Sequence, residues 1–314
     1  MKKDIEVESN KIIKHKAVLV NEVLQWLSPK PGGVYLDATF GGGGHTRAIL
    51  EKEPTCKVIA LDWDAQTLEE NGFPLQEEFG DRLQLVWGNF SLLYKILKKE
   101  KIGQLDGILA DFGPSQIQIA SRSGFSFSVD TPLDMRMSPA HQPITAADLI
   151  ASATEEKLRQ IFWQLGEERS AKRIAHTIIE ERKKKPIVST KQLADIVVKI
   201  IPYDRTKKTH PATKVFQAIR IYINRELENI ESLLAVSLKA IRPDGRLVCI
   251  SFHSLEDRLV KQFFTNKEQL GEMEILTPKA IIATKEEISN NPSARSAKLR
   301  AARIKGEKNK KGKI

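Results

Sequence analysis

The stretch VYLDATFGGGGHT, residues 34–46, joins an apolar strand pattern to an acid and a run of glycines. The strand pattern ends at Asp37, and the glycines Gly41 to Gly44 follow it before a helical segment. Glycine lets the backbone approach a ligand closely and adopts the positive φ that a tight strand-to-helix turn needs. The stretch therefore predicts a strand, a turn and a helix around a pocket able to accept a nucleotide, although a purely structural turn would show the same pattern.

Four further apolar runs resemble the first and are separated by segments of helical pattern. Continuous apolar runs of this kind are typical of strands buried on both faces of a parallel sheet, with helices covering each face. We therefore expect an α/β fold with a mostly parallel sheet, whose strands lie at residues 34–37, 57–62, 83–88, 105–111 and 246–252.

The interval between the last two of these strands is roughly a hundred residues, far more than one crossover helix requires. Helical apolar spacing fills much of it, in residues 154–165, 174–179 and 189–200. Residues 213–241 also carry one apolar stripe, which predicts a single helix that returns the chain to the sheet. We expect an α-helical insertion at residues 123–212 and a discontinuous sheet domain at 1–122 and 213–314.

Acids at the strand ends bear on which nucleotide the pocket would take. A dinucleotide fingerprint would need glycine or alanine where Thr46 stands, and the basic and hydroxyl residues of a P-loop are missing. Asp37 and Asp62, at the ends of the first two strands, instead suit S-adenosylmethionine, with Asp37 facing the ammonium and Asp62 the ribose hydroxyls. Strand ends of an open parallel sheet meet at one edge, so Gly43, Asp62, Phe90 and Asp111 should all converge there. Phe90 would lie against an adenine or in the core.

Composition indicates a protein of the reducing cytoplasm. The first residues lack the apolar core of a signal peptide, no stretch has the length of a membrane span, and Cys56 and Cys249 lack metal-ligand spacing. The formal net charge is +10, and the last twenty residues place nine basic side chains against Glu307. This basic tail is a candidate footprint for nucleic acid, although a solvated terminus would have the same composition.

Five long segments carry a family resemblance. They closely resemble the bacterial family of small-subunit (16S) ribosomal RNA cytosine-4-amino methyltransferases, called methyltransferase H of the small subunit, and the likeness runs from about His15 to Ile304. The resemblance implies a class I methyltransferase fold, Rossmann-like, with an inserted α-helical domain that binds the RNA substrate. The segments are DMRM (134–137), GEERSAKRIA (166–175), HPATKVFQAIRIYINREL (210–227), GRLVCISFHSLEDRLVK (245–261) and NPSARSAKLRAARI (291–304).

The resemblance also implies an activity. The family methylates the exocyclic 4-amino group of a cytosine, with S-adenosylmethionine as cofactor, ribosomal RNA or the small ribosomal subunit as partner, and no metal. From the residues alone, His45 would begin a helix without touching a ligand, so its role depends on the resemblance; Gly41 and Gly42 are expected only to shape the turn. The cofactor contacts carried over from the family are Gly43, Gly44, His45, Asp62, Phe90, Asp111 and Gln118.

The loop after the fourth strand departs from the family pattern. The family usually reads close to DLGVSSPQLD, and this chain reads DFGPSQIQIA from Asp111 to Ala120. Asp111 and Ser115 are retained beside the expected methyl group, and we expect one of them to accept a proton of the target amine. His253 and Glu256, just after the fifth strand, either line the target pocket or form a capping network at the strand end.

Two other functions are weighed against this one. A Rossmann dehydrogenase is opposed by the missing third glycine of its fingerprint, and a non-catalytic RNA-binding or ribosome-assembly factor is opposed by the intact Gly43, Asp62 and Asp111. A cytosine within a duplex could not reach such a pocket, so the target should be single-stranded or extruded. For that strand, stacking and phosphate contacts are offered by Trp163, residues 182–185, Lys207, Lys208 and the basic tail, although such charge runs are usually solvated surface.

Overall fold

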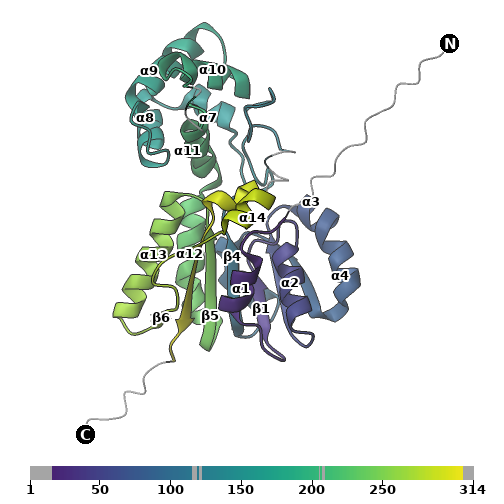
Figure 1. The fold of residues 1–314 in the computed structure, drawn as a ribbon. Helices are drawn as coiled ribbons and strands as arrows, with labels where there is room; N and C mark the ends of the chain where they lie inside the picture. Colours follow the sequence, from purple (N-terminus) through teal and green to yellow (C-terminus); the bar gives the residue numbers. More distant parts are fainter. Residues whose placement is uncertain (1–15, 115–118, 120–121, 205, 207–208, 307–314) are drawn as a thin grey trace, which may run out of the picture.

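A single sheet forms one body of the molecule, and a helical unit stands over one edge of that sheet (Figure 1). The computed structural model describes residues 16–114, 119, 122–204, 206 and 209–306. The strand order is β3-β2-β1-β4-β5-β8-β6, with β7 paired to β8. The strands are β1 Val34–Asp37, β2 Lys57–Asp62, β3 Leu83–Trp87, β4 Leu105–Asp111, β5 Ile241–Ser251, β6 Met273–Ile275, β7 Ile281–Ile282 and β8 Lys298–Ile304.

The predicted parallel sheet is confirmed. Strands β1 to β5 correspond to the five predicted apolar runs, and all pairings among them are parallel. Helices cover both faces, so consecutive strand residues such as Tyr35 and Leu36 enter different apolar layers. The helices around the sheet are α1 Val20–Leu27, α2 Gly44–Lys52, α3 Ala65–Thr67, α4 Phe73–Phe79, α5 Leu93–Lys99, α12 Glu226–Ala240, α13 Ser254–Gln269 and α14 Lys285–Asn290.

The C-terminal strand β8 was not predicted, because its charged residues hide the apolar alternation. It lies antiparallel to β5 inside the sheet, and Arg300 on it is only 9% exposed. Arg300 donates to the carboxylate of Asp257 on α13 through Nε, at 2.6 Å. The footprint interpretation of the last twenty residues is therefore wrong for Arg300, which is buried in the fold.

The helical unit has an apolar core of its own, separate from the two layers on the sheet. Its residues come from five helices, among them the three predicted from helical spacing. No helix in the described part of the chain is both long and apolar enough to cross a bilayer. The helices of this unit are α7 Ala146–Ser152, α8 Glu155–Gln164, α9 Ala171–Lys184, α10 Thr190–Ile200 and α11 Thr213–Asn224.

The predicted single helix over residues 213–241 is broken at Arg225, which adopts a left-handed conformation with φ 51°. Before the break, α11 packs in the helical core, whereas α12 packs on the sheet. Apolar packing thus changes from the helical core to the sheet at Arg225. Asn224, fully buried at the break, accepts the N–H of Met137 and donates to the carbonyl of Met135, which ties the DMRM segment to the end of α11.

We expect the Arg300–Asp257 ion pair to stabilise the fold measurably. Burial alone would raise the pKa of Asp257, but the hydrogen bond and charge of Arg300 hold that pKa below its usual value. Arg300→Met keeps the hydrocarbon stem but removes the main partner of the Asp257 carboxylate. The free energy of unfolding should fall by about 2 kcal/mol. This loss is toward the low side for a buried pair because Lys298 lies 3.5 Å from the same carboxylate. Urea denaturation measures this loss.

The matched control is Arg303→Met on the same strand. Arg303 pairs with Glu274 at the surface, where solvent screens the interaction, so this substitution should change the denaturation midpoint far less. Equal midpoints for the two variants would contradict a structural role for Arg300.

Candidate active site

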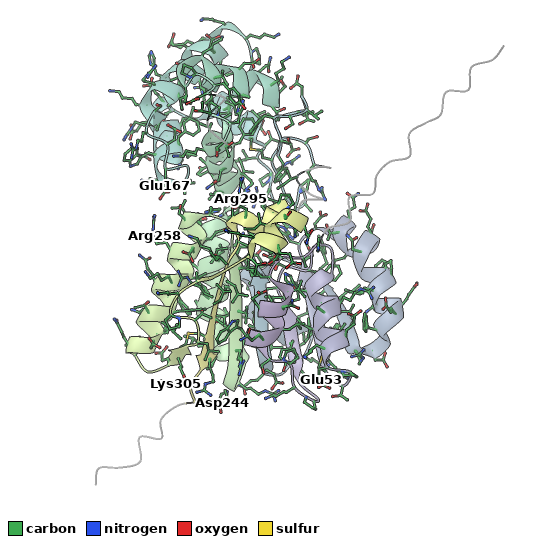
Figure 2. The ribbon with its side chains drawn as sticks, in the orientation of Figure 1. Glu53, Glu167, Asp244, Arg258, Arg295 and Lys305 are labelled. Carbon is green, nitrogen blue, oxygen red and sulfur yellow. The ribbon has the colours of Figure 1, made fainter. Side chains whose placement is uncertain are left out.

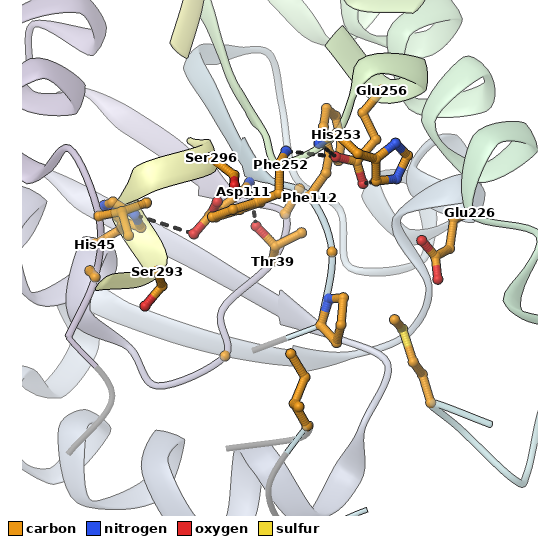
Figure 3. A pocket seen from close by; sticks show the side chains of 18 of the residues that line it. Thr39, His45, Asp111, Phe112, Glu226, Phe252, His253, Glu256, Ser293 and Ser296 are labelled. Carbon is orange, nitrogen blue, oxygen red and sulfur yellow. Dashed lines mark hydrogen bonds and ion pairs between the residues drawn. The ribbon is translucent and has the colours of Figure 1, made fainter. Parts of the chain in front are cut away.

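A cavity of about 410 Å³ opens at the carboxyl edge of the sheet, between the sheet and the helical unit. Its walls come from the β1–α2 turn, the ends of β2, β4 and β5, the start of α13, and residues of α11 and α12. The segment before β8 adds Arg295 and Ser296, so parts of the chain far apart in sequence meet there (Figure 3). The predicted convergence of the strand ends is therefore confirmed.

Asp37 lies beneath this cavity and not on its wall. Its side chain is fully buried, Oδ2 accepts the hydroxyl of Thr46 at 2.7 Å, and Oδ1 accepts the N–H of Thr39 at 3.2 Å. Burial raises the pKa of this carboxyl above its usual value. The prediction that Asp37 faces a cofactor ammonium does not hold, because the carboxylate is enclosed by the turn that it supports.

The glycines of the turn have different positions. Gly41 and Gly44 line the cavity, and the Gly41 N–H donates to Oδ2 of Asp62 at 2.9 Å. Gly43 begins α2 at φ 73°, and a Cβ there would lie 2.8 Å from the ring of Phe40. Gly41 therefore does more than shape the turn, and Gly43 owes its identity to backbone conformation and packing.

Asp62 ends β2 at the cavity wall with its carboxylate oriented by backbone donors. Each oxygen accepts one N–H at 2.9 Å, from Gly41 and from Asp64. The side chain is only 7% exposed, and burial raises the pKa of Asp62 to about 7. A carboxylate oxygen has a second acceptor position, so a ligand hydroxyl can still bind to it.

His45 and Asp111 face each other across the floor of the cavity, and the dashed line in Figure 3 joins them. His45 lies in the first turn of α2, and its Nε2 is 3.5 Å from Oδ2 of Asp111 at the end of β4. Burial lowers the pKa of His45, but the hydrogen bond and charge of Asp111 raise it further, so the pKa is above its usual value. Oδ1 of Asp111 is buried without a hydrogen-bond partner among the described residues, so it can accept a bond from a ligand.

Phe90 has the core packing considered from the sequence, and its contact with an adenine stays a prediction. It lines the cavity, and its ring also packs against the apolar layer and the ring of Phe112, with 6.1 Å between centroids. The predicted residues Ser115 and Gln118 lie outside the described part of the chain.

The opposite end of the cavity is polar. The Arg220 guanidinium donates to both oxygens of Glu226, at 2.9 and 3.0 Å, across the break between α11 and α12. His253 Nε2 lies 3.1 Å from Glu256 Oε1, while Glu256 Oε2 accepts the N–H of Phe252 at 2.8 Å. His253 and Glu256 thus form the capping network and also line the cavity, and their contact with a target base stays a prediction.

Glu256 has a lowered pKa in spite of its burial. Burial raises the pKa of Glu256, but the hydrogen bond and charge of His253 lower it further, and the net direction is downward. Glu226, His253 and Glu256 bring ligand-type atoms within 4.8 Å of one another, a spacing that a metal ion could use. Arg220 already occupies both oxygens of Glu226, and a cation there would have to displace or tolerate that guanidinium.

Sequence reasoning missed the wall that the helical unit and the C-terminal segment provide. Met137, Gln217 and Arg220 reach the cavity only because Arg225 turns the chain between two helices, and Arg295 reaches it only because β8 enters the sheet. These residues fall within or beside the segments that carry the family resemblance, but no local pattern marks them as cavity residues.

Comparison with known proteins places this site in a family. Three relatives named Ribosomal RNA small subunit methyltransferase H are similar to nearly the whole chain. The protein of Cyanothece sp. is 48% identical over 291 residues, covering 92% of this chain and 94% of the relative. Those of Rhodopseudomonas palustris and Carboxydothermus hydrogenoformans are 43% and 42% identical over 304 residues, each covering 92% of this chain and 90% and 97% of the relatives.

The family model agrees with these relatives. The model described as the MraW methylase family matches residues 12–305. The predicted class I methyltransferase fold and the predicted enzyme class are thereby confirmed, and the chain belongs to the MraW methylase family.

Proposed function

We propose that this chain transfers the methyl group of S-adenosylmethionine to the exocyclic 4-amino group of a cytosine in small-subunit ribosomal RNA, in the cytoplasm. The observation that carries the proposal is one cavity with two chemically different ends. Asp62 and Phe90 form an end suited to an adenosyl group, and Arg220, Glu226 and His253 form an end suited to a polar base. The names of the relatives support ribosomal RNA of the small subunit as the substrate.

The residues at the first end fit the cofactor. The fixed carboxylate of Asp62 offers acceptor positions for two ribose hydroxyls, and Phe90 offers an aromatic face. Gly44 and His45 line the same end. Among the described residues, Gly43 is therefore the one cofactor contact carried over from the family that does not line the cavity. When bound, S-adenosylmethionine supplies a methyl group already activated by its sulfonium.

The second end can hold a cytosine by its polar edge. That edge presents an amine donor and two acceptors, the ring nitrogen and the carbonyl oxygen. Glu226 and Glu256 provide acceptors, Arg220 and His253 provide donors, and all four line the same cavity as Asp111. Because the cavity is enclosed by both units, the base must leave its stack to enter.

Asp111 is proposed to receive the proton of the target amine. Formation of the nitrogen–carbon bond leaves a positive charge on the nitrogen, and loss of a proton to the carboxylate restores neutrality. The rest of the rate enhancement comes from holding the reacting atoms in line, an effect that can reach on the order of 7 to 11 kcal/mol. The helical unit, predicted as residues 123–212 and extended by packing to Asn224, is proposed to bind the RNA around the target.

Methyl transfer to small ribosomal subunits tests the proposal directly. The protein is incubated with labelled S-adenosylmethionine and with either small subunits lacking the modification or the naked RNA, and the methylated base is mapped. We expect one cytosine to gain one methyl group on its 4-amino nitrogen. Binding of S-adenosylhomocysteine without transfer to either substrate would instead support an inactive RNA-binding or assembly factor.

Cofactor affinity should depend on pH through Asp62. With a pKa of about 7 in the free protein, its ionised form, which accepts ribose hydroxyls better, is depleted at lower pH. We expect S-adenosylhomocysteine to bind about tenfold more weakly at pH 6 than at pH 8. The raised pKa makes the protonated form the one that favours folding, so Asp62 cannot cause this loss by unfolding the protein at low pH.

Asp62→Asn is the control for that measurement. It should bind S-adenosylhomocysteine more weakly at every pH, with little dependence between pH 6 and pH 8. If the substituted protein kept the pH dependence of the wild type, another group would be responsible.

Asp111→Asn tests the proton acceptor. An amide keeps the size of the side chain but is a far weaker base, so kcat should fall about a hundredfold. Calorimetric binding of S-adenosylhomocysteine distinguishes this loss from loss of the cofactor site. Normal binding together with full turnover would exclude an acceptor role for this carboxylate.

A further inference from the structure

We propose that a surface groove beside the active site binds a nucleotide that flanks the target cytosine, with its base stacked on Trp163 and its phosphate held by basic side chains. This inference rests on the proposed function and adds a second RNA site to it. The groove lies where the helical unit meets α13, and Figure 2 labels Glu167 and Arg258 at that junction. Its lining residues are Trp163, Gln164, Glu167, Arg169, Lys214 and Arg258.

Trp163 presents its indole to solvent. The buried face of α8 is formed by Leu158, Ile161 and Phe162, and Trp163 follows them on the outer side, 56% exposed. Within the described part of the chain it makes neither a hydrogen bond nor a ring contact. Exposed aromatic faces of this kind are what single-stranded nucleic acids stack on, whatever the base.

Three basic side chains and one acidic side chain line the groove together with the indole. Glu167 accepts from Ser254 and Arg258 of α13 at 2.9 Å each, and its carbonyl accepts from Lys214 at 3.0 Å. These contacts join the helical unit to the sheet domain and hold Lys214 and Arg258 in the groove. Arg169 has no partner among the described residues, so the groove keeps an excess of positive charge for a phosphate.

The groove and the cavity share two helices. On α11, Lys214 lines the groove and Gln217, one turn later, lines the cavity. On α13, Arg258 lines the groove and His253, just before the helix, lines the cavity. A strand whose target base enters the cavity therefore has a neighbouring base and phosphate within reach of the groove.

The chemistry favours RNA over a ribosomal protein as the occupant. A protein surface would need a larger apolar contact than one indole, whereas an aromatic face ringed by cations matches a base and its phosphate. The Glu167 contacts also fix the two walls of the groove relative to each other, which lowers the entropy lost when a flexible strand binds.

Two substitutions that break no described intramolecular contact test the site. Trp163→Ala should raise the KM for small ribosomal subunits about tenfold, with kcat and S-adenosylhomocysteine affinity nearly unchanged, and Trp163→Phe should retain most of the wild-type KM. Arg169→Ala should raise the KM severalfold. The matched controls are Tyr94→Ala, equally exposed on α5, and Lys98→Ala on the same helix, and both should resemble the wild type.

A fluorescein-labelled single-stranded oligocytidine separates stacking from phosphate contact. Arg169→Ala should reduce the slope of log affinity against log salt by about 0.7, the value for one phosphate of a single strand, whereas Trp163→Ala should weaken binding without changing the slope. Wild-type tryptophan emission should be quenched by the oligonucleotide, and Trp163→Phe should lose part of that response, because Trp63 lines the cavity and still reports a base bound there.

The outcomes are distinguishable. If the Trp163 and Arg169 variants match the Tyr94 and Lys98 controls in KM and in oligocytidine binding, the groove is not a nucleotide site. If their KM for subunits rises while oligocytidine binding stays at the wild-type level, the groove contacts a ribosomal protein and the RNA assignment is overturned. If the wild type methylates no subunit, the proposed function fails, while the oligocytidine measurements still decide the groove.

Discussion

The buried carboxylate of Asp37 holds together the edge of the sheet on which the cavity depends. It binds the hydroxyl of Thr46 in α2 and the N–H of Thr39, and the Thr39 hydroxyl in turn accepts the N–H of Asp111 at 2.7 Å. One chain of hydrogen bonds thus fixes the glycine turn, the start of α2 and the end of β4. Such a carboxylate is costly to bury, so its partners must offset desolvation, and it is not on the cavity wall where a ligand could reach it.

A second constraint brings the two units to the same cavity. Arg225 in a left-handed conformation ends α11 and begins α12, and the buried amide of Asn224 satisfies the backbone of Met135 and Met137. The Arg220–Glu226 pair spans this break. The polar end of the cavity therefore exists only because the helical unit is rigidly joined to the sheet there, and a flexible linker would not hold a base in line with a methyl group.

The sheet, its strand ends and the helical insertion could be predicted, because apolar runs and helical spacing report burial directly. Asp62 and Asp111 followed, since parallel strands end at one edge. The helix break, strand β8 and the role of Asp37 depend on tertiary contacts and could not be predicted. Apolar spacing continues across Arg225, and β8 alternates charged and apolar residues. Asp37 at a strand end has the same sequence signature whether it binds a ligand or a threonine.

Net charge was the least informative signal, because cations from one segment have different partners. In residues 295–304, Arg295 lies at the rim of the cavity, Arg300 binds Asp257 inside the fold, and Arg303 pairs with Glu274 at the surface. Counting them together suggests a basic tail, yet only a cation without an acidic partner can release counterions when a phosphate binds. Among the described residues, Arg295 at the cavity and Arg169 in the groove have no acidic partner, so the RNA path is better traced by unpaired guanidinium groups than by total charge.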